Sequence, residues 1–225
     1  SRTKDVDDVD ISTGSVGLGV AMTSFVSLIQ DYILKKKFGK KIPKGRMVAL
    51  VGDAELDEGN VYECLQEGWK HDLRNVWWII DYNRQSLDGV VHEGLSERLS
   101  SVFEAFGWNL IVLKYGRLQK DAFKEPGGNL LKKWIDDCPN QLYSALIYEG
   151  GAAFKKRVLD DIGDQDIVSK LINKRSDNEF LELMANLGGH CVPTLCDAFN
   201  GIKDDKPTAF IAYTIKGWGT PLAGH

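Results

Sequence analysis

Short apolar runs that end in polar turns alternate with helical stretches in this sequence, and this alternation limits the possible folds more than any other feature. The runs Met47–Val51 and Val76–Ile80 are continuously apolar, which is typical of strands buried on both faces of a parallel sheet. A polar turn follows each run, and a stretch with helical character separates the two. The pattern predicts an α/β domain in which helices flank a parallel sheet.

Helix and strand signals elsewhere in the chain extend this pattern. Helices are predicted over 16–34, 58–70 and 96–106, and further strands over 108–113 and 207–213. The first helix is expected to stop at Lys35–Lys37 and Gly39, because basic residues and glycine favour a helix C-terminus. The stretch 116–205 has a mostly helical and polar pattern, with amphipathic helices expected over 155–171 and 178–187. We therefore expect a mostly helical insertion within the sheet domain.

Composition argues against several classes of function. The net charge is −4, so no general affinity for nucleic acid is expected, and any phosphate must be held by a local group of residues. No apolar run approaches the roughly 18 residues of a membrane span. The four cysteines form no CxxC pair, which predicts reduced thiols and a cytoplasmic location. Neither end of the sequence resembles a domain boundary, so we expect one domain over residues 1–225 that is a fragment of a longer chain.

Polar side chains follow the two apolar runs in a pattern that suits a metal and a phosphate. Asp53 comes directly after the first run, and Asn83 and Gln85 follow the second, with Asn83 placed 30 residues after Asp53. The carboxyl ends of parallel strands are where ligands bind, so these oxygens can converge on Mg²⁺. A helix expected to begin near Glu55 would offer free N–H groups to the same phosphates, and the small Ala54 would allow close approach. A single strand-end Gly-Asp is usually only a turn, whereas the paired motif is far more specific.

At this point the sequence resembles the thiamine-diphosphate-dependent enzymes, which carry Gly-Asp-Gly and then, about thirty residues on, Asn. It is most similar to the homodimeric pyruvate dehydrogenase branch, and transketolases are more distant. The motifs are STGSVGLG at 12–19, GDAELDEGN at 52–60, DYNRQSLDG at 81–89, NLGGH at 186–190 and TIKGWG at 214–219. The long helical insertion also favours the pyruvate dehydrogenase branch.

The resemblance implies a role for each residue that matches a family motif. Magnesium would be bound by Asp53, Asn83 and Gln85. The remaining implied contacts are Ala54, Glu55 and Asp81 along the diphosphate, Val16 and Leu87 near the thiamine rings, and Lys216 as a catalytic residue beside the cofactor. Two positions depart from the family pattern: Ala54 stands where glycine is usual, and Asp81 stands where asparagine is common. Ala54 fits if its φ angle is negative, whereas Asp81 adds a negative charge near a diphosphate.

The resemblance also implies an activity. It is the oxidative decarboxylation of pyruvate with acetyl transfer to the lipoyl group of an acyltransferase, by a homodimer with thiamine diphosphate and Mg²⁺ at its interface. The family's activating glutamate and catalytic histidines would lie outside this chain. Two alternatives remain open: ketol transfer between sugar phosphates, as in transketolase, and a non-catalytic domain that binds a partner.

The remaining histidines and tryptophans are expected to be structural. His190 follows two glycines and lies near two cysteines, but a zinc site needs more ligands at regular spacing. It is therefore expected to be structural or to line the active-site mouth. His225 would stand where related enzymes begin a mobile active-site loop. The pair Trp77 and Trp78 is expected in the core of the sheet.

Overall fold

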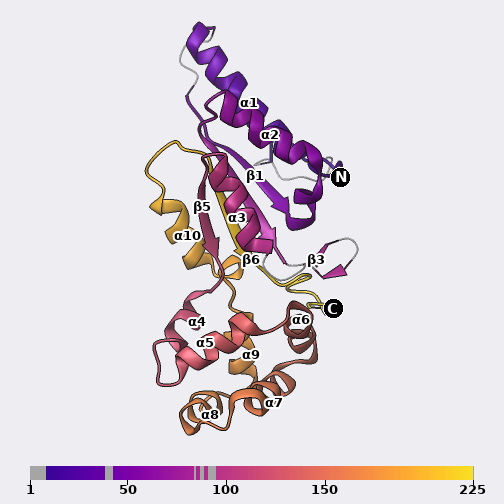
Figure 1. Cartoon of the computed structure of the whole chain (residues 1–225), viewed down its shortest axis with the longest axis vertical. Coiled ribbons are helices and arrows are strands. Elements are labelled where there is room, and N and C mark those ends of the chain that lie inside the picture. Colours follow the sequence, from indigo (N-terminus) through magenta and orange to yellow (C-terminus); the bar gives the residue numbers. More distant parts are fainter. Residues whose placement is uncertain (1–8, 39–42, 84, 87–88, 91–94, 225) are drawn as a thin grey trace. The chain divides into compact units, whose positions relative to one another are not determined.

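The computed structural model describes residues 9–38, 43–83, 85–86, 89–90 and 95–224 (Figure 1). The chain separates into two compact units. The first unit comprises Ser1–Tyr82, Gly94–Val112 and Ile202–Ile211, and the second comprises Asn83–Glu93, Leu113–Gly201 and Ala212–His225. Among the described residues, no helix has both the length and the apolar character that crossing a membrane requires.

A four-stranded parallel sheet has the order β1-β2-β6-β5. Its strands are β1 (Met47–Gly52), β2 (Val76–Tyr82), β6 (Thr208–Tyr213) and β5 (Asn109–Leu113). The parallel register of the first two strands runs from Met47 opposite Val76 to Gly52 opposite Asp81. The carboxyl ends of β1 and β2 are therefore level, and the predicted α/β class with a parallel sheet is confirmed.

Aromatic side chains pack on one face of this sheet at β2. The ring of Trp78 lies 4.4 Å from that of Trp108 and 5.9 Å from that of Phe103 on helix α3 (Leu95–Ala105). Successive strand residues point to opposite faces, so Trp77 lies on the other side, with the Arg46 guanidinium 4.1 Å from its ring centre. The predicted core position is confirmed for Trp78, whereas Trp77 is only half-buried. Burial on both faces, expected for Met47–Val51, is wrong: β1 is an edge strand, and its Val48 and Leu50 are exposed.

Helix α1 (Leu18–Lys36) packs against β1 and against helix α2 (Gly59–Lys70). It starts and stops two residues later than the predicted helix over 16–34. At its C-terminus Lys37 adopts a left-handed φ of 56° and its N–H donates to Leu34 O at 3.2 Å. Such a left-handed residue closes many helices, so the predicted stop at the lysine run is confirmed.

The segment after β1 differs from the prediction. A 3₁₀ turn, η2 (Asp53–Asp57), follows the strand directly. Glu58 then has an extended backbone, with φ −80° and ψ 130°, so α2 can begin only at Gly59. The helix predicted over 58–70 is confirmed, whereas its expected start near Glu55 is wrong, and the role of N–H groups here towards phosphates stays a prediction.

The second unit contains the helices expected between 116 and 205. They are α4 (Arg117–Ala122), α5 (Gly128–Asp137), α6 (Asn140–Glu149), α7 (Gly151–Ile162), α8 (Asp166–Asn173), α9 (Asp177–Ala185) and α10 (Val192–Gly201). Their core is aromatic, since the ring of Phe154 lies 5.2 Å from that of Tyr143 and 6.1 Å from that of Phe180. All three residues are almost fully buried, and the mostly helical character of this stretch is confirmed.

Two details of the second unit differ from the sequence pattern. The helix expected over 155–171 is interrupted between α7 and α8, where the Ser169 hydroxyl donates to Gly163 O at 2.6 Å. This side-chain bond closes the turn locally and offers the backbone an alternative to helix. The short strands β3 (Gln85–Ser86) and β4 (Gly89–Val90) pair antiparallel. They are too short to produce an alternating pattern, and the sequence did not predict them.

Candidate functional site

The residues that were expected to bind the metal follow the carboxyl ends of β1 and β2. Asp53 follows the last residue of β1, and Asn83 follows Tyr82 at the end of β2. The register places Gly52 opposite Asp81, so both strands end at the same height. This edge of a parallel sheet is where α/β folds bind ligands.

Asp53 has the properties of a metal-binding carboxylate. Asp53 is only 6% exposed. One of its oxygens, Oδ1, accepts the Ala54 N–H at 2.9 Å, which fixes the orientation of the carboxylate. Ala54 is not among the described non-glycine residues with positive φ, so alanine fits here without strain. The donor is a hard oxygen at a ligand-binding edge and suits Mg²⁺.

Glu55 has a structural role that the sequence did not reveal. Its Oε2 accepts the Gly17 N–H at 3.0 Å, and its Oε1 accepts the Gly52 N–H at 3.3 Å. The carboxylate therefore bridges the turn before α1 and the end of β1. Both oxygens already accept backbone hydrogen bonds. The contact with the diphosphate that the family resemblance implies stays a prediction.

Gly17 is packed too closely for any side chain. Its φ is +77°, and an added Cβ would lie 2.5 Å from Asn60 Oδ1 and 2.9 Å from Glu58 Cβ. Val16, the implied thiamine contact, directly precedes Gly17 and is 42% exposed. The turn that carries Val16 is thus held against the start of α2 by close packing as well as by the bonds to Glu55.

The structure divides the predicted ligands between the two units. Asp53 and Asp81 belong to the first unit, whereas Asn83 and Gln85 belong to the second. Gln85 is the first residue of β3, and Leu87 lies outside the described residues. The convergence of Asp53, Asn83 and Gln85 on one metal ion therefore stays a prediction.

Lys216 lies in the second unit, in a turn that His190 helps to fix. His190 Nε2 accepts the Ile215 N–H at 2.8 Å, and its ring stacks on Trp218 with 5.0 Å between ring centres. The Lys216 carbonyl accepts the Gly224 N–H at 2.9 Å. An accepting Nε2 requires a neutral imidazole with its proton on Nδ1. His190 thus has a structural role in this turn, and its expected alternative place at the active-site mouth stays a prediction. No three His, Cys, Asp or Glu side chains gather as a metal site among the described residues.

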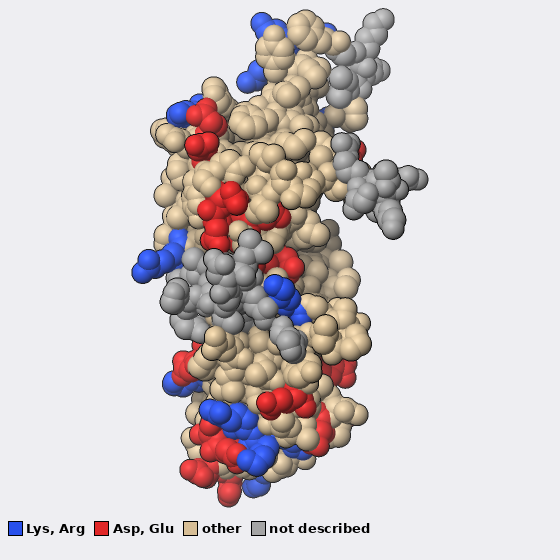
Figure 2. Space-filling view, turned by 90° about the vertical axis from the view of Figure 1, so that its right-hand side faces the viewer, with Lys and Arg blue, Asp and Glu red and all other residues tan. Residues whose placement is uncertain are grey.

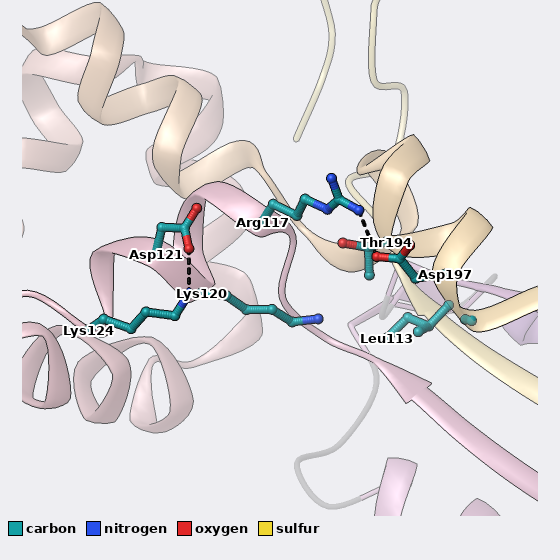
Figure 3. A pocket seen from close by; sticks show the side chains of 8 residues that line it. Leu113, Arg117, Lys120, Asp121, Lys124, Thr194 and Asp197 are labelled. Carbon is teal, nitrogen blue, oxygen red and sulfur yellow. Dashed lines mark hydrogen bonds and ion pairs between the residues drawn. The ribbon is translucent and has the colours of Figure 1, made fainter. Parts of the chain in front are cut away.

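A separate pocket of about 510 Å³ lies within the second unit, between α4 and α10 (Figure 3). Two ion pairs lie along its wall, Arg117 with Asp197 at 2.7 Å and Lys124 with Asp121 at 2.6 Å. None of the predicted cofactor or metal residues lines it. On the molecular face drawn in Figure 2, acidic and basic residues are interspersed.

Sequence comparison adds a family to this geometry. The sequence model of the transketolase thiamine-diphosphate-binding domain matches residues 2–123. This range includes α1, both strand ends and the Asp53 turn. The match therefore covers the part of the chain in which the candidate site was found.

Relatives with similarity along nearly the whole chain carry the name pyruvate dehydrogenase E1 component. The protein of Buchnera aphidicola (subsp. Schizaphis graminum) is 28% identical over 211 residues, which cover 92% of this chain and 23% of that protein. The Escherichia coli K12 protein is 26% identical over 211 residues, which again cover 92% of this chain and 23% of that protein. A transketolase of Staphylococcus aureus is 32% identical, but over 49% of this chain and 17% of its own length. The chain thus spans about a quarter of the length of the pyruvate dehydrogenase E1 relatives.

Proposed function

Because this chain belongs to the transketolase thiamine-diphosphate-binding domain family, we propose that the full-length protein uses thiamine diphosphate and Mg²⁺ to decarboxylate pyruvate oxidatively. The acetyl group would pass to the lipoyl group of an acyltransferase partner. The enzyme would be a cytoplasmic homodimer with its cofactor at the subunit interface. The observation that carries the proposal is the buried Asp53 carboxylate at the level ends of β1 and β2.

This chain would supply the anchor of the cofactor. Asp53 would bind Mg²⁺ together with Asn83 and Gln85, since carboxylate and amide oxygens are ligands that Mg²⁺ accepts. Ala54 leaves room beside the anchor because its side chain is a single methyl group. Thiamine diphosphate, when bound, supplies the nucleophile and the electron sink for the reaction.

The extent of similarity favours pyruvate over sugar phosphates as the substrate. Relatives named pyruvate dehydrogenase E1 component match 92% of the chain, helical insertion included, whereas the transketolase matches 49%. Ketol transfer between sugar phosphates is the second candidate function, supported by the family model and by that transketolase. A domain that only binds a partner is the third candidate, and the buried Asp53 carboxylate argues against it.

Lys216 is the residue of this chain that we propose for the reaction itself. Its ammonium group could pair with the substrate carboxylate or with the diphosphate. Either partner gives a charge-assisted hydrogen bond of about 1.5–3 kcal/mol. In both cases the role of Lys216 is to hold a negative group in place.

Cofactor binding tests the anchor directly. In the full-length protein, Asp53→Ala should weaken Mg²⁺-dependent binding of thiamine diphosphate at least about a hundredfold, which corresponds to roughly 2.8 kcal/mol. Glu63→Gln is the control, because Glu63 is an exposed acidic residue of α2. Calorimetric titration measures both affinities. Unchanged binding by the Asp53 variant would reject the metal assignment.

Substrate turnover separates the remaining candidates. The full-length enzyme is given pyruvate with an artificial electron acceptor, and in parallel a pair of sugar phosphates. We expect turnover of pyruvate only. Turnover of the sugars but not of pyruvate would establish ketol transfer. A protein that turns over neither substrate and binds no thiamine diphosphate when the cofactor is supplied would favour a binding domain.

A further inference from the structure

One carboxylate in the first unit serves two backbone turns that lie far apart in the sequence. Glu55 accepts the Gly17 N–H at 3.0 Å and the Gly52 N–H at 3.3 Å. Gly17 precedes α1, and Gly52 precedes η2. Neither glycine has a side chain that could cap its own helix, and unsatisfied N–H groups at a helix start need an acceptor. Glu55 supplies that acceptor to both.

The two turns that Glu55 joins are the ones that carry candidate cofactor residues. Val16 precedes Gly17, and Asp53 follows Gly52. We propose that Glu55 is a positioning residue of the cofactor site, which holds the Val16 turn at a fixed distance from the Asp53 turn. This inference rests on the proposed use of thiamine diphosphate and assigns Glu55 no contact with the cofactor.

The chemistry of the bridge requires both the two oxygens and the length of glutamate. Glutamine keeps one acceptor oxygen but presents an NH₂ group to the second N–H, so one hydrogen bond is lost and two donors face each other. Aspartate keeps the charge but is one methylene shorter, so it cannot reach Gly17 and Gly52 together. The two variants therefore separate the loss of the bridge from the loss of the charge.

The test compares Glu55→Gln and Glu55→Asp with wild-type full-length protein, using Glu63→Gln as the charge control. Titration with thiamine diphosphate and Mg²⁺ should show affinity lower by about tenfold for both Glu55 variants, which corresponds to about 1.4 kcal/mol. Amide hydrogen exchange of Gly17 and Gly52, measured without cofactor, should be faster in both variants. The Glu63 variant should match the wild type.

Three results would overturn the inference. Tighter binding by Glu55→Gln would show that the carboxylate acts by repelling the diphosphate. Wild-type affinity in both variants, with only a lower free energy of unfolding, would show that the bridge is structural and nothing more. Unchanged exchange of the two glycine amides would show that Glu55 does not hold them. A wild-type protein that binds no thiamine diphosphate at all would instead reject the proposed function, so the two failures are distinguishable.

Discussion

Replacing Gly17 by alanine should destabilise the first unit through two separable effects. The first is backbone conformation, since the φ of Gly17 is +77° and a left-handed residue with a Cβ costs about 1–2 kcal/mol. The second is crowding, since the new Cβ would lie 2.5 Å from Asn60 Oδ1 and 2.9 Å from Glu58 Cβ. The amide end of Asn60 can rotate away, but Glu58 Cβ is attached to the backbone. Such overpacking adds about 1–3 kcal/mol.

The chain contains matched controls for each effect. Gly107 has the same φ of +77°, but an added Cβ there would meet nothing within 4 Å. Gly107→Ala should therefore cost only the conformational part, about 1–2 kcal/mol. Gly14 has open space and no positive φ, so Gly14→Ala should change stability by less than about 0.5 kcal/mol. All three substitutions restrict the unfolded chain alike, and that contribution cancels in the comparison.

Urea unfolding followed by circular dichroism measures the three free energies of unfolding. We expect the cost of Gly17→Ala to exceed that of Gly107→Ala by about 1–3 kcal/mol, with unchanged dependence on urea concentration. Gly17→Ala should also weaken thiamine diphosphate binding, because the turn that carries Val16 must move. Equal costs for Gly17→Ala and Gly107→Ala would refute the close contact between this turn and the start of α2.

Three further predictions concern the second unit. Lys216→Ala should lower turnover of pyruvate by the full-length enzyme, and a higher KM would identify the substrate carboxylate as its partner, whereas unchanged kinetics would exclude Lys216 from the reaction. His190→Ala should cost about 1 kcal/mol of stability or more, because the Ile215 N–H loses its acceptor, and a neutral result in urea unfolding would contradict this. Burial pushes the pKa of Asp136 upward, but hydrogen bonds from Lys114, Lys132 and Tyr115 outweigh it and lower the pKa. The stability that ionised Asp136 gives the folded protein is therefore complete above the pKa of the unfolded chain, about 3.9, and is lost as the pH falls through the lower folded pKa. Asp136→Asn should therefore make the free energy of unfolding fall less steeply in acid.

The sequence determined the parallel sheet and identified Asp53 as the candidate metal ligand at the end of one of its strands. Short continuous apolar runs such as Met47–Val51 are typical of strands in a parallel sheet, and parallel strands bring their carboxyl ends to one edge. Asp53 could therefore be placed at a ligand-binding edge from pattern alone, because both facts depend on residues close together in the chain. The sequence did not show that β1 is an edge strand on which Val48 and Leu50 stay exposed. The family motifs in the same segments then indicated thiamine diphosphate.

Only the tertiary structure decided what surrounds that edge. Glu55 is three residues from Gly52, a spacing that a capping pattern could have suggested, but its bond to Gly17 spans 38 residues. The hydrogen bond from the Ile215 N–H to the neutral His190 likewise spans 25 residues. Such bonds leave no periodic trace in the sequence, because they depend on where whole elements come to lie after the core has packed. Which polar group meets which distant backbone N–H is settled by that packing.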